Sequence, residues 1–152
     1  MIMLRKAHSL HDFDIVLFGA GEFAKLVNRP DLFPEPGSPQ MRELVEKLFW
    51  TPGFAVLLYE HGGELAGGIG FWIGPFLMNV GKIEWQEIFW WAAPGAPASV
   101  AMRLLFAAKN IGKEAGATIF TAHSLLSSPA GVDKAYRTLG LTPLQTTYMG
   151  IA

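Results

Sequence analysis

The chain has 152 residues, of which 51% are hydrophobic and 16% are charged, so it can bury one sizeable core and is not of the disordered class. The net charge of −1 gives no electrostatic basis for binding nucleic acid or an anionic membrane. The lack of cysteine excludes disulfides, thiolate catalysis and cysteine metal sites. We therefore expect a single domain over residues 1–152.

The first third of the chain is predicted to form a strand and two helices. Residues 1–6 are typical of a short strand. Apolar residues then recur at helical spacing, at Phe13, Val16, Ala20, Phe23, Ala24 and Val27. A proline-rich loop follows over residues 28–38. Ser38 is positioned to cap a second helix, which begins at Pro39 and ends before residues 52–53.

The middle of the chain is predicted to form three strands. Residues 54–60 and 64–72 are each typical of a strand. The turn residues between them indicate that the two strands form a hairpin. A turn at residues 79–81 then leads to a long strand over residues 82–92. Residues 65–81 carry no charge, but they are glycine-rich and short for a membrane span. A buried strand pair is the better interpretation, and we expect no membrane segment.

Residues 87–103 indicate the end of the buried strand, a Pro/Gly turn and a helix capped by Ser99. Such a unit directs several backbone N–H groups at one spot, which suits an anionic group. The rest of the chain predicts a strand at residues 117–122, a short helix at 129–139 and a last strand at 141–151. The order β-α-α-β-β-β-α-β-α-β is typical of an α/β (α+β) fold with a mixed sheet.

Residues 15–24 carry a competing pattern. They match a strand followed by G-x-G-x-x-A, the dinucleotide-binding fingerprint, at Gly19, Gly21 and Ala24. The next predicted strand ends at Glu60, about twice as far along as the ribose-binding acid is expected. We keep a Rossmann-type nucleotide-binding module at Gly19-Ala20-Gly21 as an alternative to the helix.

Two local patterns point to a family. Residues 135–141 read AYRTLGL, and residues 87–116 form the strand–loop–helix unit described above. Together with the element order, they resemble the GNAT superfamily of acyl-CoA-dependent N-acetyltransferases, with its A-Y-x-x-x-G-F/L signature and its CoA pyrophosphate loop. The resemblance spans nearly the whole chain. It implies a mixed, mostly antiparallel central sheet flanked by helices, with acetyl-CoA as cosubstrate.

The pyrophosphate loop diverges from the family pattern. The pattern Q/R-x-x-G-x-G/A falls on residues 96–101, where only Ala101 matches and Pro97 supplies no N–H. Because such loops bind phosphate mainly through backbone donors at a helix start, we still expect this segment to bind the cosubstrate. The implied cofactor-binding residues are Trp91, Ala92, Ala93, Ala98, Ser99, Val100 and Ala101.

Acetyl transfer to an amine is helped by a general base and a general acid. Glu87 is the candidate base, because neighbouring aromatic residues should desolvate it and raise its pKa, and because the resemblance places a base on this strand. Glu84 competes for this role, and Glu87 could also be a simple outward-facing polar residue. Tyr136 is the candidate acid, because the family's tyrosine here lies near the CoA sulfur. The alternative is a tyrosine that only packs on the sheet.

The remaining polar groups form no second catalytic pattern. His123 ends a predicted strand, and the other histidines lack ligand spacing, so we expect no metal site. The tryptophans around the central strands are explained by core packing, although one or two could wall an acceptor pocket for an apolar or planar substrate. The resemblance implies that the loop at residues 28–38 sets acceptor specificity.

The sequence thus predicts a cytoplasmic N-acetyltransferase that uses acetyl-CoA and a direct attack by an amine on a small molecule or protein. No nucleic-acid or membrane partner is expected, and a homodimer is left open. The rival from another class is a GNAT-like binding or interaction module without catalysis, which the divergence at residues 96–99 favours.

Overall fold

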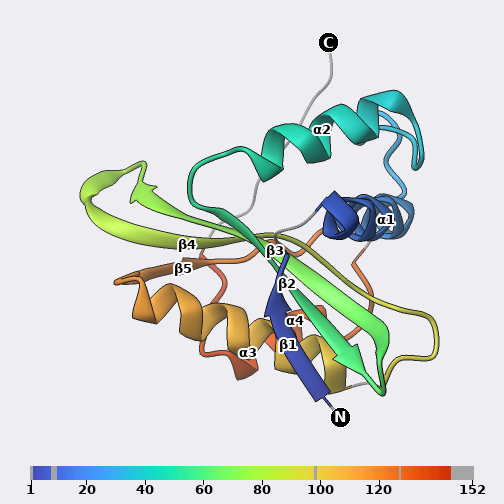
Figure 1. The fold of residues 1–152 in the computed structure, drawn as a ribbon. Helices are drawn as coiled ribbons and strands as arrows, with labels where there is room; N and C mark the ends of the chain where they lie inside the picture. The colour runs from blue at the N-terminus through green and yellow to red at the C-terminus, as the bar shows by residue number, and fades with distance from the viewer. Residues whose placement is uncertain (1, 8–9, 98, 127, 145–152) are drawn as a thin grey trace.

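The protein is built around one five-stranded sheet in the order β1-β2-β3-β4-β5 (Figure 1). The computed structural model describes residues 2–7, 10–97, 99–126 and 128–144. The strands are β1 (Ile2–Lys6), β2 (Phe54–His61), β3 (Glu64–Phe76), β4 (Asn79–Ala92) and β5 (Ile119–Thr121). Neighbouring strands are antiparallel except β4 and β5, which are parallel. The mixed, mostly antiparallel sheet is the fold class predicted from the sequence.

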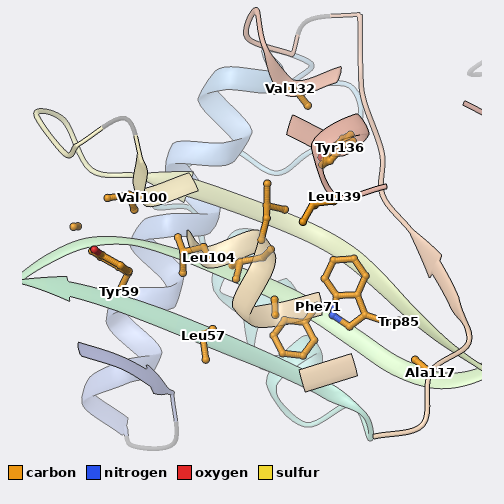
Figure 2. Close-up of a cluster of buried hydrophobic side chains, with 14 residues drawn as sticks. Leu57, Tyr59, Phe71, Trp85, Val100, Leu104, Ala117, Val132, Tyr136 and Leu139 are labelled. Carbon is orange, nitrogen blue, oxygen red and sulfur yellow. The ribbon is translucent and has the colours of Figure 1, made fainter. Parts of the chain in front are cut away.

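Helices cover both faces of the sheet. They are α1 (Leu10–Val27), α2 (Pro39–Phe49), α3 (Ser99–Glu114) and α4 (Val132–Thr138). One core cluster joins the sheet to α1 and α2, and a second joins it to α3 and α4, including Trp85 and Tyr136 (Figure 2). The Ser38 hydroxyl accepts a hydrogen bond from the Met41 N–H at 3.1 Å, as the predicted cap of α2 requires. In the part of the chain that the structure describes, no helix is long and apolar enough to cross a membrane.

The glycines that suggested a dinucleotide fingerprint lie inside α1. Residues 15–24 are helical throughout, so the strand and turn that the fingerprint requires are missing. Gly19 has a packing role instead, because a Cβ there would overlap the indole ring of Trp91. The Rossmann-type alternative is therefore wrong.

A β-bulge in β4 decides which side chains face which helices. Gly70 of β3 pairs with Phe89, but the next residue, Phe71, pairs with Glu87, so Ile88 is the extra residue. Before the bulge, Trp85 packs in the cluster with α3 and α4; after it, Phe89 packs with α1 and α2. The simple alternation of a regular strand is broken at this point.

Five predicted boundaries or elements were wrong, only partly right or mostly outside the described residues. The β3–β4 turn lies at residues 77–78 and not at 79–81, because Asn79 already pairs with Phe76 in the ladder. β5 and α4 are shorter than predicted, and α3 begins at Ser99 itself. The predicted last strand lies mostly outside the described residues, and residues 141–144 are not in a strand.

Candidate active site

The bulge brings Glu87 and Trp90 to the face of the sheet that α4 covers. Both side chains contact the hydroxyl of Tyr136: Trp90 Nε1 at 3.3 Å and Glu87 Oε2 at 3.3 Å. Ile88 and Phe89, between them in sequence, pack on the opposite face. β4 therefore presents Glu87 and Trp90 on one face of the sheet and the apolar Ile88 and Phe89 on the other.

Glu87 and Trp90 lie where β4 continues beyond the end of its pairing with β5. β4 and β5 pair only over Glu84–Gln86 and Ile119–Thr121, and β4 then continues to Ala92. Beyond the last pair, the Glu87 carboxylate takes the place of a ladder partner, because it accepts the His123 N–H at 3.2 Å. The Glu87 side chain thus bridges β4 and the segment that follows β5.

Glu87 is a buried carboxylate held by neutral donors. Its exposed fraction is 2%, and it makes no ion pair within the described residues. Burial raises the pKa of Glu87 to about 7, and the hydrogen bonds from His123 and Tyr136 only partly oppose this rise. The raised pKa predicted from the surrounding aromatic residues is confirmed, and it suits a general base near neutral pH.

Tyr136 shares its hydroxyl among three partners. The oxygen lies 3.1 Å from the His123 carbonyl oxygen and 3.3 Å from Glu87 Oε2, so its single proton can be donated to either. The Trp90 N–H donates to the same oxygen. Burial, and then the charge of Glu87, raise the pKa of Tyr136, while the Trp90 hydrogen bond lowers it. The phenol is thus a weak acid with a donor in place to stabilise its anion.

Comparisons with known proteins identify the architecture. No family model and no curated protein matches the sequence. A transcriptional regulator from Bacillus halodurans C-125 matches at 15% identity and a TM-score of 0.77, covering 99% of this chain and 100% of that one. A ribosomal-protein-alanine N-acetyltransferase from Brucella melitensis biovar Abortus 2308 matches at 14% and 0.71, covering 100% and 99%.

A third solved structure is AAC(6')-Iy in complex with the bisubstrate analogue CoA-S-monomethyl-acetylneamine. It matches at 14% identity and a TM-score of 0.71, covering 100% of this chain and 98% of that one. The chain has the GNAT fold. This confirms the fold that the resemblance implied. At sequence identities this low, the likeness shows the fold alone.

In the loop between β4 and α3, which the sequence predicted to bind pyrophosphate, internal hydrogen bonds occupy some of the backbone donors. The Ala93 N–H donates to the Ala66 carbonyl oxygen at 2.9 Å, and the Val100 N–H donates to that of Pro97 at 2.9 Å. These two predicted donors are therefore already used within the fold. Ser99 is exposed at the first residue of α3, whose first turn carries no acidic residue. An anion at this helix start would meet no carboxylate from that turn.

The other predicted cofactor-binding residues lie in different settings. Trp91 is fully buried among α1, α2 and the sheet, so its side chain does not reach the loop. Ala92 is exposed at the end of β4, and Ala101 is half-buried in α3. Ala98 lies outside the described residues.

Glu84, the competing base, is not brought to Tyr136. Its carboxylate accepts a hydrogen bond from the Thr121 hydroxyl, in the part of β4 that still pairs with β5. Sequence reasoning missed Trp90, whose indole N–H binds the Tyr136 hydroxyl across 46 positions of sequence. Among the described residues, no group of three or more His, Cys, Asp or Glu side chains could hold a metal ion.

Proposed function

We propose that the protein is an N-acetyltransferase that moves an acetyl group from acetyl-CoA to an amine by direct attack. The observation that carries the proposal is the buried Glu87–Tyr136 pair, at the edge where β4 parts from β5. Further support comes from the GNAT fold, which the chain shares with a ribosomal-protein-alanine N-acetyltransferase and with AAC(6')-Iy bound to a CoA bisubstrate analogue. The acceptor would be an amine on a small molecule or on a protein.

The loop and helix start between β4 and α3 would hold the CoA pyrophosphate. The residues fit this role in part: the segment is built of small residues, α3 has 16 residues, and its first turn lacks acids. Ser99 is exposed there and offers a hydroxyl and a backbone donor. Acetyl-CoA supplies the activated acyl group when bound.

The pair would carry one proton from the amine to the departing thiolate. Glu87 accepts the proton that the amine loses as its nitrogen bonds to the acyl carbon. As the carbon–sulfur bond breaks, Tyr136 gives its proton to the thiolate. Glu87 then returns the proton it holds to Tyr136 across their 3.3 Å contact. The pair ends as it began, and the products are an amide and a thiol.

Thermal-shift titration with acetyl-CoA, CoA and NAD tests the cosubstrate. A ligand that binds only the folded state adds RT ln(1 + [L]/Kd) to the free energy of unfolding and so raises the melting temperature. We expect both CoA species to stabilise the protein and NAD to have no effect. No shift with either CoA species at millimolar concentration would overturn the proposal.

Tyr136→Phe tests the acid. The substitution keeps the ring and removes the hydroxyl, so CoA binding should be unchanged while turnover falls by about 10²-fold or more. Turnover is followed by the release of CoA thiol with any acceptor found. Unchanged turnover would remove Tyr136 from the mechanism.

A second candidate function is a non-catalytic binding module on the same fold. The divergence of residues 96–99 favours it, and so does the likeness to a chain described as a transcriptional regulator. Such a module would bind CoA weakly or not at all and would transfer no acyl group to any amine. The titration and the thiol-release assay together distinguish the two functions.

A further inference from the structure

Helix α4 carries Tyr136 and is the shortest helix in the described part of the chain. It spans Val132–Thr138, seven residues. A helix this short is marginal by itself, because most of its backbone groups find no partner within it. Gly131, at its N-cap, has no side chain to bind the free N–H groups. The position of Tyr136 therefore depends on contacts between α4 and the rest of the fold.

A lysine of α3 binds the C-terminal end of α4. Lys109 Nζ donates a hydrogen bond to the carbonyl oxygen of Leu139, the C-cap residue of α4. The same ammonium lies 5.2 Å from the centre of the Phe120 ring in β5, which is a cation–π contact. A cation at a helix C-terminus binds a carbonyl that has no partner within the helix and interacts favourably with the helix dipole. Lys109 thus joins α3, β5 and α4 at one point.

The carbonyl that Lys109 binds belongs to the same helical turn as Tyr136. The Gly140 N–H donates to the Arg137 carbonyl oxygen at 2.9 Å, and the Leu141 N–H donates to that of Tyr136 at 3.0 Å. These two bonds form a Schellman motif, in which Gly140 takes a φ of 80°. Tyr136 and Leu139 also pack in one core cluster (Figure 2). A displacement of the Leu139 carbonyl would therefore move Tyr136 as well.

The contacts of the Tyr136 hydroxyl leave little room for such a displacement. Its oxygen lies 3.3 Å from Glu87 Oε2 and 3.3 Å from Trp90 Nε1, at the long end of the hydrogen-bond range. A further shift of about 0.5 Å would break both bonds. The ion pair of Arg137 with Asp133 lies within α4 and is exposed, so it does not hold the helix in place. Lys109, in contrast, reaches α4 from another helix.

We propose that Lys109 is a positioning residue, which holds α4 where the Tyr136 hydroxyl can bind Glu87. It acts through the Leu139 carbonyl and the last turn of α4, and not on the reacting atoms. Its effect on turnover rests on the proposed acetyl transfer, in which Tyr136 is the acid. Its effect on the contact between Glu87 and Tyr136 depends on no reaction.

Lys109→Met tests this role, because methionine keeps an unbranched stem and a high helix propensity but has no ammonium. The Tyr136 hydrogen bond lowers the pKa of Glu87, so its loss should make Glu87 titrate at a higher pH than in the wild type. Carbon-13 NMR of the glutamate carboxyl groups measures the titration. Tyr136→Phe, which removes the hydroxyl itself, should change it in the same direction. Adding Lys109→Met to Tyr136→Phe should then have no further effect.

Turnover, measured by the release of CoA thiol, gives a second reading. Because a small displacement of a catalytic group slows the reaction, kcat should fall about tenfold in Lys109→Met. In the Tyr136→Phe background it should fall no further. Lys109→Arg keeps a cationic donor and should retain the wild-type titration and kcat. Lys134→Met makes the same change at an exposed position of α4 itself and should alter neither.

The outcomes separate this inference from the proposed function. An equal titration of Glu87 in the wild type and in Lys109→Met would overturn the inference, even if the melting temperature fell. A higher titration in the variant, without acetylation of any amine by the wild type, would support the positioning role and overturn the transferase. Circular dichroism checks folding, and Lys109→Gln, with a shorter uncharged side chain, decides by the same readings if Lys109→Met does not fold.

Discussion

Two carboxylates in this protein are equally buried but differently paired. Asp12 and Glu87 both have an exposed fraction of 2%. Asp12, at the start of α1, lies 2.8 Å from the guanidinium of Arg5, which also binds Glu60 at 2.8 Å. Among the residues that the structure describes, the donors to Glu87 are neutral: a backbone N–H and a phenol.

The difference separates a structural carboxylate, Asp12, from Glu87, the carboxylate that we propose as the general base. The arginine offsets the desolvation of Asp12 and ties β1 to α1 and β2. Without a cation, burial brings the pKa of Glu87 to about 7, where it can take up and release a proton near neutral pH. Desolvation without a counter-charge is therefore the mark of the candidate active site.

The largest expected effect is on turnover when Glu87 is replaced. Glu87→Gln keeps the shape and the hydrogen-bond acceptor but cannot take a proton, so kcat should fall by about 10²- to 10⁴-fold. The measurement is CoA thiol release at saturating acetyl-CoA. Glu46→Gln, the same change at an exposed position of α2, is the control and should leave kcat unchanged.

Replacing Arg5, the cation paired with Asp12, should lower the free energy of unfolding and leave turnover unchanged. Arg5→Met leaves Asp12 buried without its guanidinium, which should cost about 3 kcal/mol of the free energy of unfolding. Urea denaturation measures it. Arg42→Met breaks the exposed contact with Asp14 and should cost less than about 1 kcal/mol. If the two variants were equally stable, Asp12 would not need its cation.

Glu87 should also make the stability of the protein depend on pH. The pKa of Glu87 is raised on folding from 4.5 to about 7, so the folded protein binds this proton more tightly than the unfolded chain does. The stabilisation is fully present below pH 4.5 and is lost as the pH rises to about 7, by about 3 kcal/mol. In Glu87→Gln that fall should vanish. A wild-type and a variant with parallel pH–stability curves would contradict the raised pKa.

The smallest effect concerns the donor to Tyr136. Trp90→Phe removes the N–H that lowers the pKa of Tyr136 and should cost about 1 kcal/mol, or roughly fivefold in kcat if the bond acts in the transition state. Turnover and the melting temperature are measured together. A lower melting temperature with unchanged kcat would limit Trp90 to packing.

The sequence predicted what local patterns can encode. The helical stripe after residue 10, the cap at Ser38 and the middle hairpin were all read correctly. The raised pKa of Glu87 was also predicted, and its cause in the structure is burial. The resemblance placed Tyr136 on a late helix, where the structure has it beside that carboxylate.

The rest depends on contacts that are distant in sequence. No local sequence pattern predicts the bulge at Ile88, because large side chains both precede and follow it. The bulge is defined by the pairing of Gly70 with Phe89 and of Phe71 with Glu87. Gly19 looked like part of a phosphate loop, and only the position of the Trp91 ring shows why it lacks a side chain. Both features required the folded sheet.

The most direct test is a carbon-13 NMR titration of the protein labelled at glutamate carboxyl groups, with Glu87→Gln to assign the signal. We predict one carboxyl that titrates at about pH 7 and is missing from the variant. If every glutamate titrated near the ordinary value of 4.5, Glu87 would be a solvated side chain and the central claim would be wrong.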